Sequence, residues 1–94
     1  MRIVWLNQAV ADLYHIREYI RLENPAAAEK TGVRIEAAVA GLARFPEMGA
    51  AGDVPGTREL IIPRLEYFAV YRLRDDAVQI LRVLHQRQKW PSEL

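Results

Sequence analysis

The order of the predicted elements indicates an α+β domain of type β-α-α-β-β-β, with a mostly antiparallel sheet and an N-terminal helical hairpin packed on one face. Two observations predict this class. Residues 8–44 carry apolar side chains at helical spacing with one interruption, whereas residues 57–85 form three short apolar runs separated by turn residues. With 94 residues, the chain is expected to form a single domain over residues 1–94.

The first elements are a short strand and a helix. The apolar run from Ile3 to Leu6 predicts the strand, and Asn7 is a good N-cap for a helix from Gln8 to about Leu22. One face of this helix is expected to be buried, because its apolar residues recur at helical spacing: Leu6, Val10, Leu13, Ile16 and Ile20.

The pair Asn24-Pro25 predicts the start of a second helix. Asn caps the first turn, and proline at the first helical position loses no hydrogen bond. The helix is expected to extend to about Arg44 and to bury Ile35, Ala38, Val39, Leu42 and Phe45. Its many alanines allow close approach to the first helix, and the short turn between the two predicts an antiparallel hairpin.

The C-terminal half begins with a loop and continues as three strands. The loop from Pro46 to Gly56 contains three of the five glycines and is long for a compact domain, so it is expected to be mobile or functional. The strands are predicted over residues 57–62, 67–73 and 78–85. Residues 63–66 form a tight connection, and Asp75-Asp76 form the turn before the last strand.

The composition excludes several classes of function. A net charge of +1 is too small for nucleic-acid binding over the whole surface, so no direct nucleic-acid binding is expected. There is no cysteine, His15 and His85 lie on different elements, and Ser92 is the only serine, so no metal, cofactor or serine nucleophile is expected. The chain has no apolar run of roughly 20 residues and no signal-peptide pattern, which favours a cytoplasmic protein without a membrane partner.

The last strand and the residues after it are basic and aromatic. Arg82 interrupts the apolar run of residues 80–84, so it should either pair with an acid, with Glu59 as a candidate, or line an open face. His85 is interpreted as a hydrogen-bonded structural residue or as a catalyst. Trp90 is either an aromatic at the edge of the core or the residue that packs the C-terminus down. This segment is suited to contact something anionic or something large.

Several motifs, taken in order, carry a resemblance to a known family over essentially the whole chain. They are Asp12-Leu13 and Ile16-x-x-Tyr19-Ile20; Asn24-Pro25-Ala26-Ala27-Ala28; Leu42-x-x-Phe45-Pro46-x-x-Gly49; Gly56-Thr57-Arg58-Glu59-Leu60; Tyr67-x-x-x-Tyr71-Arg72; and Ile80-Leu81-Arg82-Val83-Leu84-His85-x-Arg87-x-x-Trp90. Each motif alone is weak, but their order and spacing resemble the RelE/ParE superfamily of toxins from bacterial type II toxin–antitoxin modules. The resemblance implies the same β-α-α-β-β-β fold and a cognate antitoxin as partner.

Two mechanisms occur on this family's fold, so the resemblance alone does not choose between them. RelE-type toxins cleave messenger RNA in the ribosome with lysines, arginines and a terminal tyrosine or histidine, whereas ParE-type toxins inhibit DNA gyrase. In this chain Phe68 and Gln86 stand where RelE-type toxins have arginines, and Trp90 stands near the expected tyrosine. The resemblance therefore implies a ParE-like gyrase inhibitor without catalysis. The alternatives are a ribosome-dependent endoribonuclease and an inactive module that retains only antitoxin binding.

These readings assign residues to three sets. The expected target-binding set consists of Arg58, Arg64, Arg82, His85, Arg87, Lys89 and Trp90. In the nuclease alternative, His85 is the acid/base and Arg58, Arg82 and Arg87 hold phosphate. The antitoxin is expected to cover apolar stripes of the hairpin that one small sheet cannot bury, namely Leu13, Ile16, Ile20, Ile35, Val39 and Leu42.

Overall fold

The computed structural model describes residues 1–91 and has two helices packed against a five-stranded sheet. The elements are β1 (Arg2–Trp5), α1 (Asn7–Arg21), α2 (Pro25–Ala40), the 3-10 turn η1 (Gly41–Ala43), β2 (Ala50–Ala51), β3 (Thr57–Ile61), β4 (Tyr67–Arg74) and β5 (Ala77–His85). The strand order is β1-β5-β4-β3-β2. Only β1 and β5 pair in parallel, and the other neighbours are antiparallel. The predicted α+β class is therefore confirmed.

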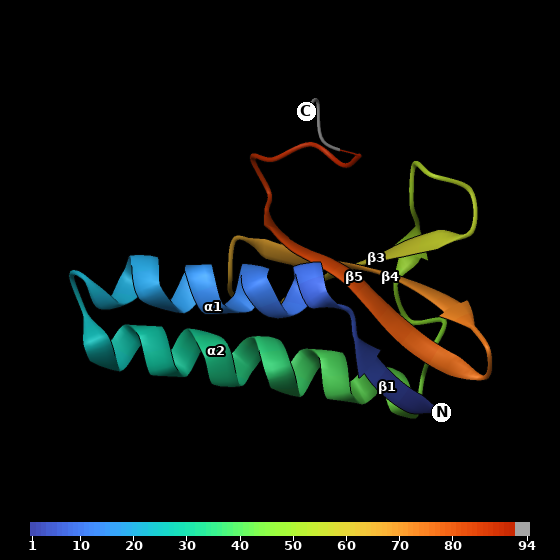
Figure 1. The fold of residues 1–94 in the computed structure, drawn as a ribbon, viewed down its shortest axis with the longest axis horizontal. Coiled ribbons are helices and arrows are strands. Elements are labelled where there is room, and N and C mark those ends of the chain that lie inside the picture. Colours follow the sequence, from blue (N-terminus) through green and yellow to red (C-terminus); the bar gives the residue numbers. More distant parts are fainter. Residues whose placement is uncertain (92–94) are drawn as a thin grey trace.

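Figure 1 shows α1 and α2 as an antiparallel hairpin beside the sheet. The face of the sheet that packs on the helices forms the main core. Its buried residues come from both helices and from β3, β4 and β5: Ala9, Leu13, Ile35, Val39, Leu42, Leu60, Ile62, Ala69, Tyr71, Val78, Ile80 and Val83. Within residues 1–91, every helix is too short or too polar to cross a bilayer.

This core corrects the prediction that apolar stripes of the hairpin remain uncovered. Leu13, Ile35, Val39 and Leu42 are all at most 7% exposed, so they lie inside the domain rather than on an antitoxin surface. Ile16 and Ile20 are half-buried. For the four buried residues the prediction is wrong, because side chains of β3, β4 and β5, among them Tyr71 and Ile80, pack against them in one core. For Ile16 and Ile20 it stays a prediction.

The two helices begin differently. Asn24 caps α2 as predicted: its Oδ1 accepts a hydrogen bond from the backbone N–H of Ala27 at 3.0 Å. For α1 the prediction of Asn7 as N-cap is wrong, because Leu6 occupies that position in an extended conformation. The backbone N–H of Leu6 donates to the carbonyl of Ile80 at 3.0 Å, so the chain passes directly from strand pairing into the helix.

The end of α2 also differs from its prediction. The α-helix ends at Ala40 and continues as η1, and Phe45 is 60% exposed instead of buried. A 3-10 turn advances about 120° per residue rather than 100°. This change of twist leaves Leu42 in the core but turns Phe45, three residues further on, to the surface.

The opposite side of the sheet, here called the outer face, carries a second and smaller cluster. Phe68, Val70 and Leu84 are buried there, and Leu81 and Trp90 pack against them. These residues follow the strand alternation, because Phe68 and Leu84 are paired and point to the same face. The outer face is thus covered by the segment of residues 86–91 after β5, here called the tail, rather than by a helix.

Candidate functional site

The tail is held in a defined path over the end of the sheet. The backbone N–H of Gln86 donates to the carbonyl of Glu66 at 2.8 Å, and that of Gln88 donates to the carbonyl of His85 at 2.8 Å. The side-chain oxygen of Gln88 in turn accepts from the backbone N–H of His85 at 2.8 Å. These bonds turn the chain back immediately after β5, and so Trp90 reaches the outer-face cluster.

The long loop before β3 is anchored from the sheet at its beginning. The hydroxyl of Tyr71 donates to the carbonyl of Pro46 at 2.8 Å and accepts from the N–H of Gly49 at 2.9 Å. Burial raises the pKa of Tyr71, which keeps this hydroxyl neutral and able to donate. Arg58 Nη1 donates to the carbonyls of Glu47 and Gly49 at 3.1 and 2.6 Å. The predicted target-binding residue Arg58 therefore positions the loop.

The rest of the loop is a tight turn that approaches β3 closely. Gly52 donates its N–H to the carbonyl of Thr57 at 2.9 Å, and the Thr57 hydroxyl donates to the carbonyl of Val54 at 2.6 Å. A Cβ on Gly52 would lie 2.5 Å from the Thr57 hydroxyl oxygen, and Gly56 has a φ of +85°, so both positions require glycine. The loop forms β2 on the way, a strand of two residues that sequence patterns could not predict.

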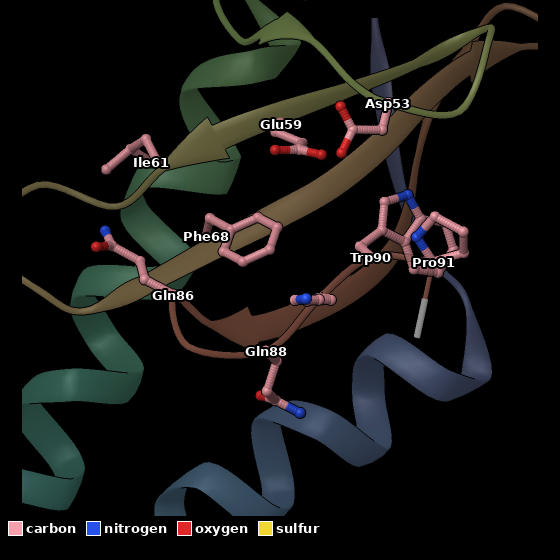
Figure 2. A pocket seen from close by; sticks show the side chains of 9 residues that line it. Asp53, Glu59, Ile61, Phe68, Gln86, Gln88, Trp90 and Pro91 are labelled. Atoms are coloured by element: carbon pink, nitrogen blue, oxygen red, sulfur yellow. The ribbon is translucent and has the colours of Figure 1, made fainter. Parts of the chain in front are cut away.

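A groove of about 630 Å³ lies on the outer face between this loop and the tail. Its lining comes from the loop, from β3 and β4, and from the tail: Asp53, Glu59, Ile61, Phe68, Gln86, Gln88, Lys89, Trp90 and Pro91. Figure 2 shows the carboxylates of Asp53 and Glu59 turned toward each other on one side, with Trp90 and Pro91 adjacent to them. The groove thus combines two carboxylates, two amides, an ammonium group and aromatic walls.

Arg82 does not line this groove. Its Nε and Nη2 donate to the two carboxylate oxygens of Asp12 at 2.7 and 3.1 Å, and the backbone N–H of Val83 donates to the same carboxylate at 2.9 Å. The predicted ion pair exists, but the partner is Asp12 on α1 and not Glu59. This pairing is possible because β1 ends opposite Ile80, so α1 takes its place along the rest of β5. The carboxylate of Asp12 raises the pKa of Arg82 further.

His85 and Arg87 belong to a different cavity, on the helix side of the tail. It measures about 400 Å³ and is lined by His15, Ile16, Tyr19, Tyr67, His85, Arg87 and Gln88. His85 Nδ1 accepts from the backbone N–H of Arg87 at 3.1 Å, so Nε2 carries the proton and donates to Glu66 at 2.9 Å. Arg64 lies beside α2 in a third cavity, with Arg34 and Pro63.

The structure therefore separates the residues that the sequence grouped together. In the strand register, His85 lies opposite Tyr67 of β4 and Arg58 lies opposite Tyr71 of β4. Tyr67 and Tyr71 are four positions apart on this strand, which corresponds to roughly 13 Å. Arg82 is bound to Asp12. Of the predicted target-binding set, only Lys89 and Trp90 line the groove. Ser92 lies outside the described residues.

Sequence reasoning missed Asp53, Gln86 and Gln88 as groove residues and considered Glu59 only as a partner for Arg82. One signal was available for Glu59, since it alternates with the core residue Leu60 and so must face the outer side. The length of the glycine-rich loop was a second signal. Among residues 1–91 there is no cluster of three histidine or acidic side chains that could hold a metal.

Comparisons with known proteins agree with this fold. Residues 3–90 match the family model described as "ParE toxin of type II toxin-antitoxin system, parDE". The chain is 40% identical over 93 residues to "Putative toxin Y4kP" of Sinorhizobium fredii, covering 99% of this chain and 96% of that protein. It is 33% identical over 84 residues to "Toxin RelE2" of Caulobacter vibrioides, covering 89% and 93%.

A solved structure extends the comparison to three dimensions. A chain of the "Chromosomal ParDE TA system from P. aeruginosa" superposes with a TM-score of 0.83 at 31% identity, covering 90% of this chain and 95% of that one. Since the family match spans nearly the whole length of the protein, it includes the helical hairpin, the sheet and most of the tail. The chain belongs to the ParE toxin family of type II toxin–antitoxin systems, within the RelE/ParE superfamily.

Proposed function

We propose that this toxin inhibits DNA gyrase by binding it and that it performs no catalysis. The observation that carries the proposal is the placement of the cations. Arg58 is bound to loop carbonyls and Arg82 to Asp12, so neither is available to hold a phosphate. The groove of the outer face instead carries Asp53 and Glu59, whose charges repel an RNA backbone.

A supercoiling assay with purified gyrase tests this proposal. Relaxed plasmid, ATP and gyrase are incubated with micromolar toxin in the absence of antitoxin, and the product topoisomers are separated on a gel. We expect loss of supercoiled product, and restoration when antitoxin is added first. Full supercoiling at saturating toxin, with a toxin that still binds its antitoxin, would contradict the proposal.

A ribosome-dependent endoribonuclease is the second candidate. One observation favours it: a relative with 33% identity is named "Toxin RelE2". In that case His85 is the acid/base, and His85→Ala must abolish message cleavage after induction. We expect no message cleavage by the wild-type toxin or by His85→Ala. The Nε2 proton of His85 is already donated to Glu66, and the four nuclease candidates are not gathered at one site.

We further propose that a cognate antitoxin binds the hairpin at a surface that shares only Leu13 with the set predicted from sequence. A cavity of about 500 Å³ opens between α1, α2 and β1, lined by Trp5, Val10, Leu13, Tyr14, Arg17, Glu18 and Glu36. Val10 and Tyr14 are 53% and 59% exposed, which leaves apolar surface for a partner. The similarity to a chain of a ParDE toxin–antitoxin system supports such a partner.

A further inference from the structure

The groove on the outer face has two carboxylates that make no ion pair within residues 1–91. Within residues 1–91, the ion pairs involve Arg17, Arg21, Arg82 and His85, and none includes Asp53 or Glu59. Figure 2 shows these two carboxylates turned toward each other. Two like charges in this arrangement favour a cation placed between them. Lys89 also lines the groove, so the lining holds two negative charges and one positive charge.

The walls of the groove are suited to the aliphatic and planar parts of a long cationic side chain. Phe68 and Trp90 pack together in the outer-face cluster, and both line the groove. A guanidinium group stacks on aromatic rings and binds carboxylates through a planar fork of N–H donors, whereas an ammonium group does neither as well. Carboxylates beside an aromatic wall therefore favour arginine.

Other groups in the groove are suited to a peptide backbone. The indole N–H of Trp90 is buried and has no hydrogen-bond partner among the described residues, so an acceptor supplied by a ligand would satisfy it. The exposed side-chain amide of Gln86 can both donate and accept. A backbone carbonyl next to an arginine side chain supplies the acceptor that the indole lacks.

We propose that this groove binds an arginine side chain carried by an extended segment of the toxin's protein target. The guanidinium lies between Asp53 and Glu59, its stem packs along Phe68 and Trp90, and a neighbouring carbonyl accepts from the indole. This inference rests on the proposed function, because it concerns the recognition of a protein rather than of RNA. It assigns target recognition to carboxylates of the toxin, in place of the arginines expected from sequence.

Titration with a short peptide tests the groove directly. The chain has two tryptophans, Trp5 and Trp90, so a ¹⁵N-labelled sample has two indole N–H signals, which Trp90→Phe assigns. The probe is a blocked pentapeptide with one central arginine between alanines, and the control peptide has citrulline, which is uncharged, in its place. We expect the arginine peptide to shift the Trp90 indole signal in a saturable way and the citrulline peptide to leave it unchanged. Equal shifts with both peptides, or none, would overturn the inference.

Matched variants locate the charge that matters. The double variant Asp53→Asn with Glu59→Gln removes both groove carboxylates. It should lower the affinity for the arginine peptide by about tenfold or more. The control is Asp75→Asn with Asp76→Asn, which removes the same number of charges at the β4–β5 turn. Both aspartates there have a φ of 57°, a conformation that asparagine tolerates. Equal weakening by the control would show that only net charge matters and would overturn the inference.

The supercoiling assay separates failure of this inference from failure of the proposed function. If the wild-type toxin inhibits gyrase and the groove variant does not, with antitoxin binding unchanged, both the inference and the proposed function are supported. If the groove variant inhibits as strongly as wild type, the inference is wrong and gyrase remains the target. If wild type does not inhibit gyrase, the proposed function is wrong, and the peptide titration still decides whether the groove binds arginine. A ribo-oligonucleotide that shifts the Trp90 signal would contradict both.

Discussion

The carboxylate of Asp12 joins α1 to β5 through three hydrogen bonds. It accepts from Arg82 twice and from the backbone N–H of Val83 once, and the side chains of Asp12 and Arg82 are only 16% and 19% exposed. Asp12→Ala should lower the free energy of unfolding by about 2–3 kcal/mol, since it leaves a cation and an N–H without an acceptor. Urea unfolding followed by circular dichroism measures this.

Two further variants make this measurement specific. Asp12→Asn keeps one acceptor oxygen for Val83 and should cost less than Asp12→Ala. Glu18→Ala removes an exposed ion pair with Arg21 and should leave the unfolding midpoint nearly unchanged. A loss of stability from Glu18→Ala equal to that from Asp12→Ala would contradict this account.

The ion pair also has a pH dependence. The pKa of Arg82 is raised by Asp12, so the stability that the arginine contributes is fully present below its usual pKa and is lost only at more alkaline pH.

Tyr71 holds the beginning of the loop from inside the sheet. Tyr71→Phe removes one bond to Pro46 and one from Gly49, and should cost about 1–3 kcal/mol because both backbone groups lose a buried partner. Tyr14→Phe, at an exposed site, is the control and should cost little. Thermal or urea unfolding of the three proteins gives the comparison.

The pKa of Tyr71 also sets a pH dependence with a definite sign. Burial raises this pKa above its usual value of 10, so the unfolded chain releases the proton at a lower pH than the folded one. Stability from this group is fully present below pH 10 and falls as the pH rises through the folded pKa. Burial raises the pKa of Tyr67 in the same direction, so Tyr71→Phe should reduce the alkaline loss of stability without removing it.

At the residue scale, the sequence predicted that a side chain requires a partner better than it predicted which residue that partner is. A charge inside the apolar run of residues 80–84 required an acid, and the structure confirms an ion pair for Arg82. The partner was assigned wrongly because Asp12 lies 70 positions away and meets Arg82 only through the replacement of β1 by α1 along β5. Contacts of this kind depend on tertiary packing, which spacing along the chain does not encode.

At the element scale, the two helix starts provide an internal comparison. Asn24→Ala removes the acceptor for the N–H of Ala27 and should destabilise the domain by about 1 kcal/mol. Asn7→Ala should have little effect, because Leu6 is the N-cap of α1. Urea unfolding of both variants measures the difference. Equal losses would show that the cap of α2 contributes no more than any polar residue near a helix start.

Elements with a long pattern were predicted well, and short ones were not. The apolar patterns of β4 and β5 and the Asn24-Pro25 signal placed three elements within a few residues of their observed bounds. β2 has two residues and no pattern of its own, and it exists because the anchored loop brings Ala50 and Ala51 opposite Glu59 and Arg58. The position of Asp53 follows from that loop path, so this wall of the groove could not be predicted.

At the scale of the whole molecule, the two faces of the sheet have different covers. The helices cover one face, and this packing buries four of the six residues that sequence reasoning assigned to an antitoxin. The outer face has only the tail and the loop over it, and this incomplete cover creates the groove. The domain therefore presents two separate surfaces: the cavity beside Val10 on the helix side and the groove beside Trp90 on the outer face (Figure 2).

These two surfaces predict that antitoxin binding and target inhibition can be separated by mutation. Val10→Asp places a charge in the helix-side cavity and should weaken antitoxin binding by about tenfold or more, while gyrase inhibition persists. Val33→Asp is the matched control, because Val33 is 57% exposed, close to the 53% of Val10, but does not line the cavity. Calorimetric titration of antitoxin into each variant gives the affinities, and the supercoiling assay gives the inhibition. If Val33→Asp lowered the affinity for the antitoxin as much as Val10→Asp, the antitoxin would have to cover both helices broadly, and the cavity would have no special role.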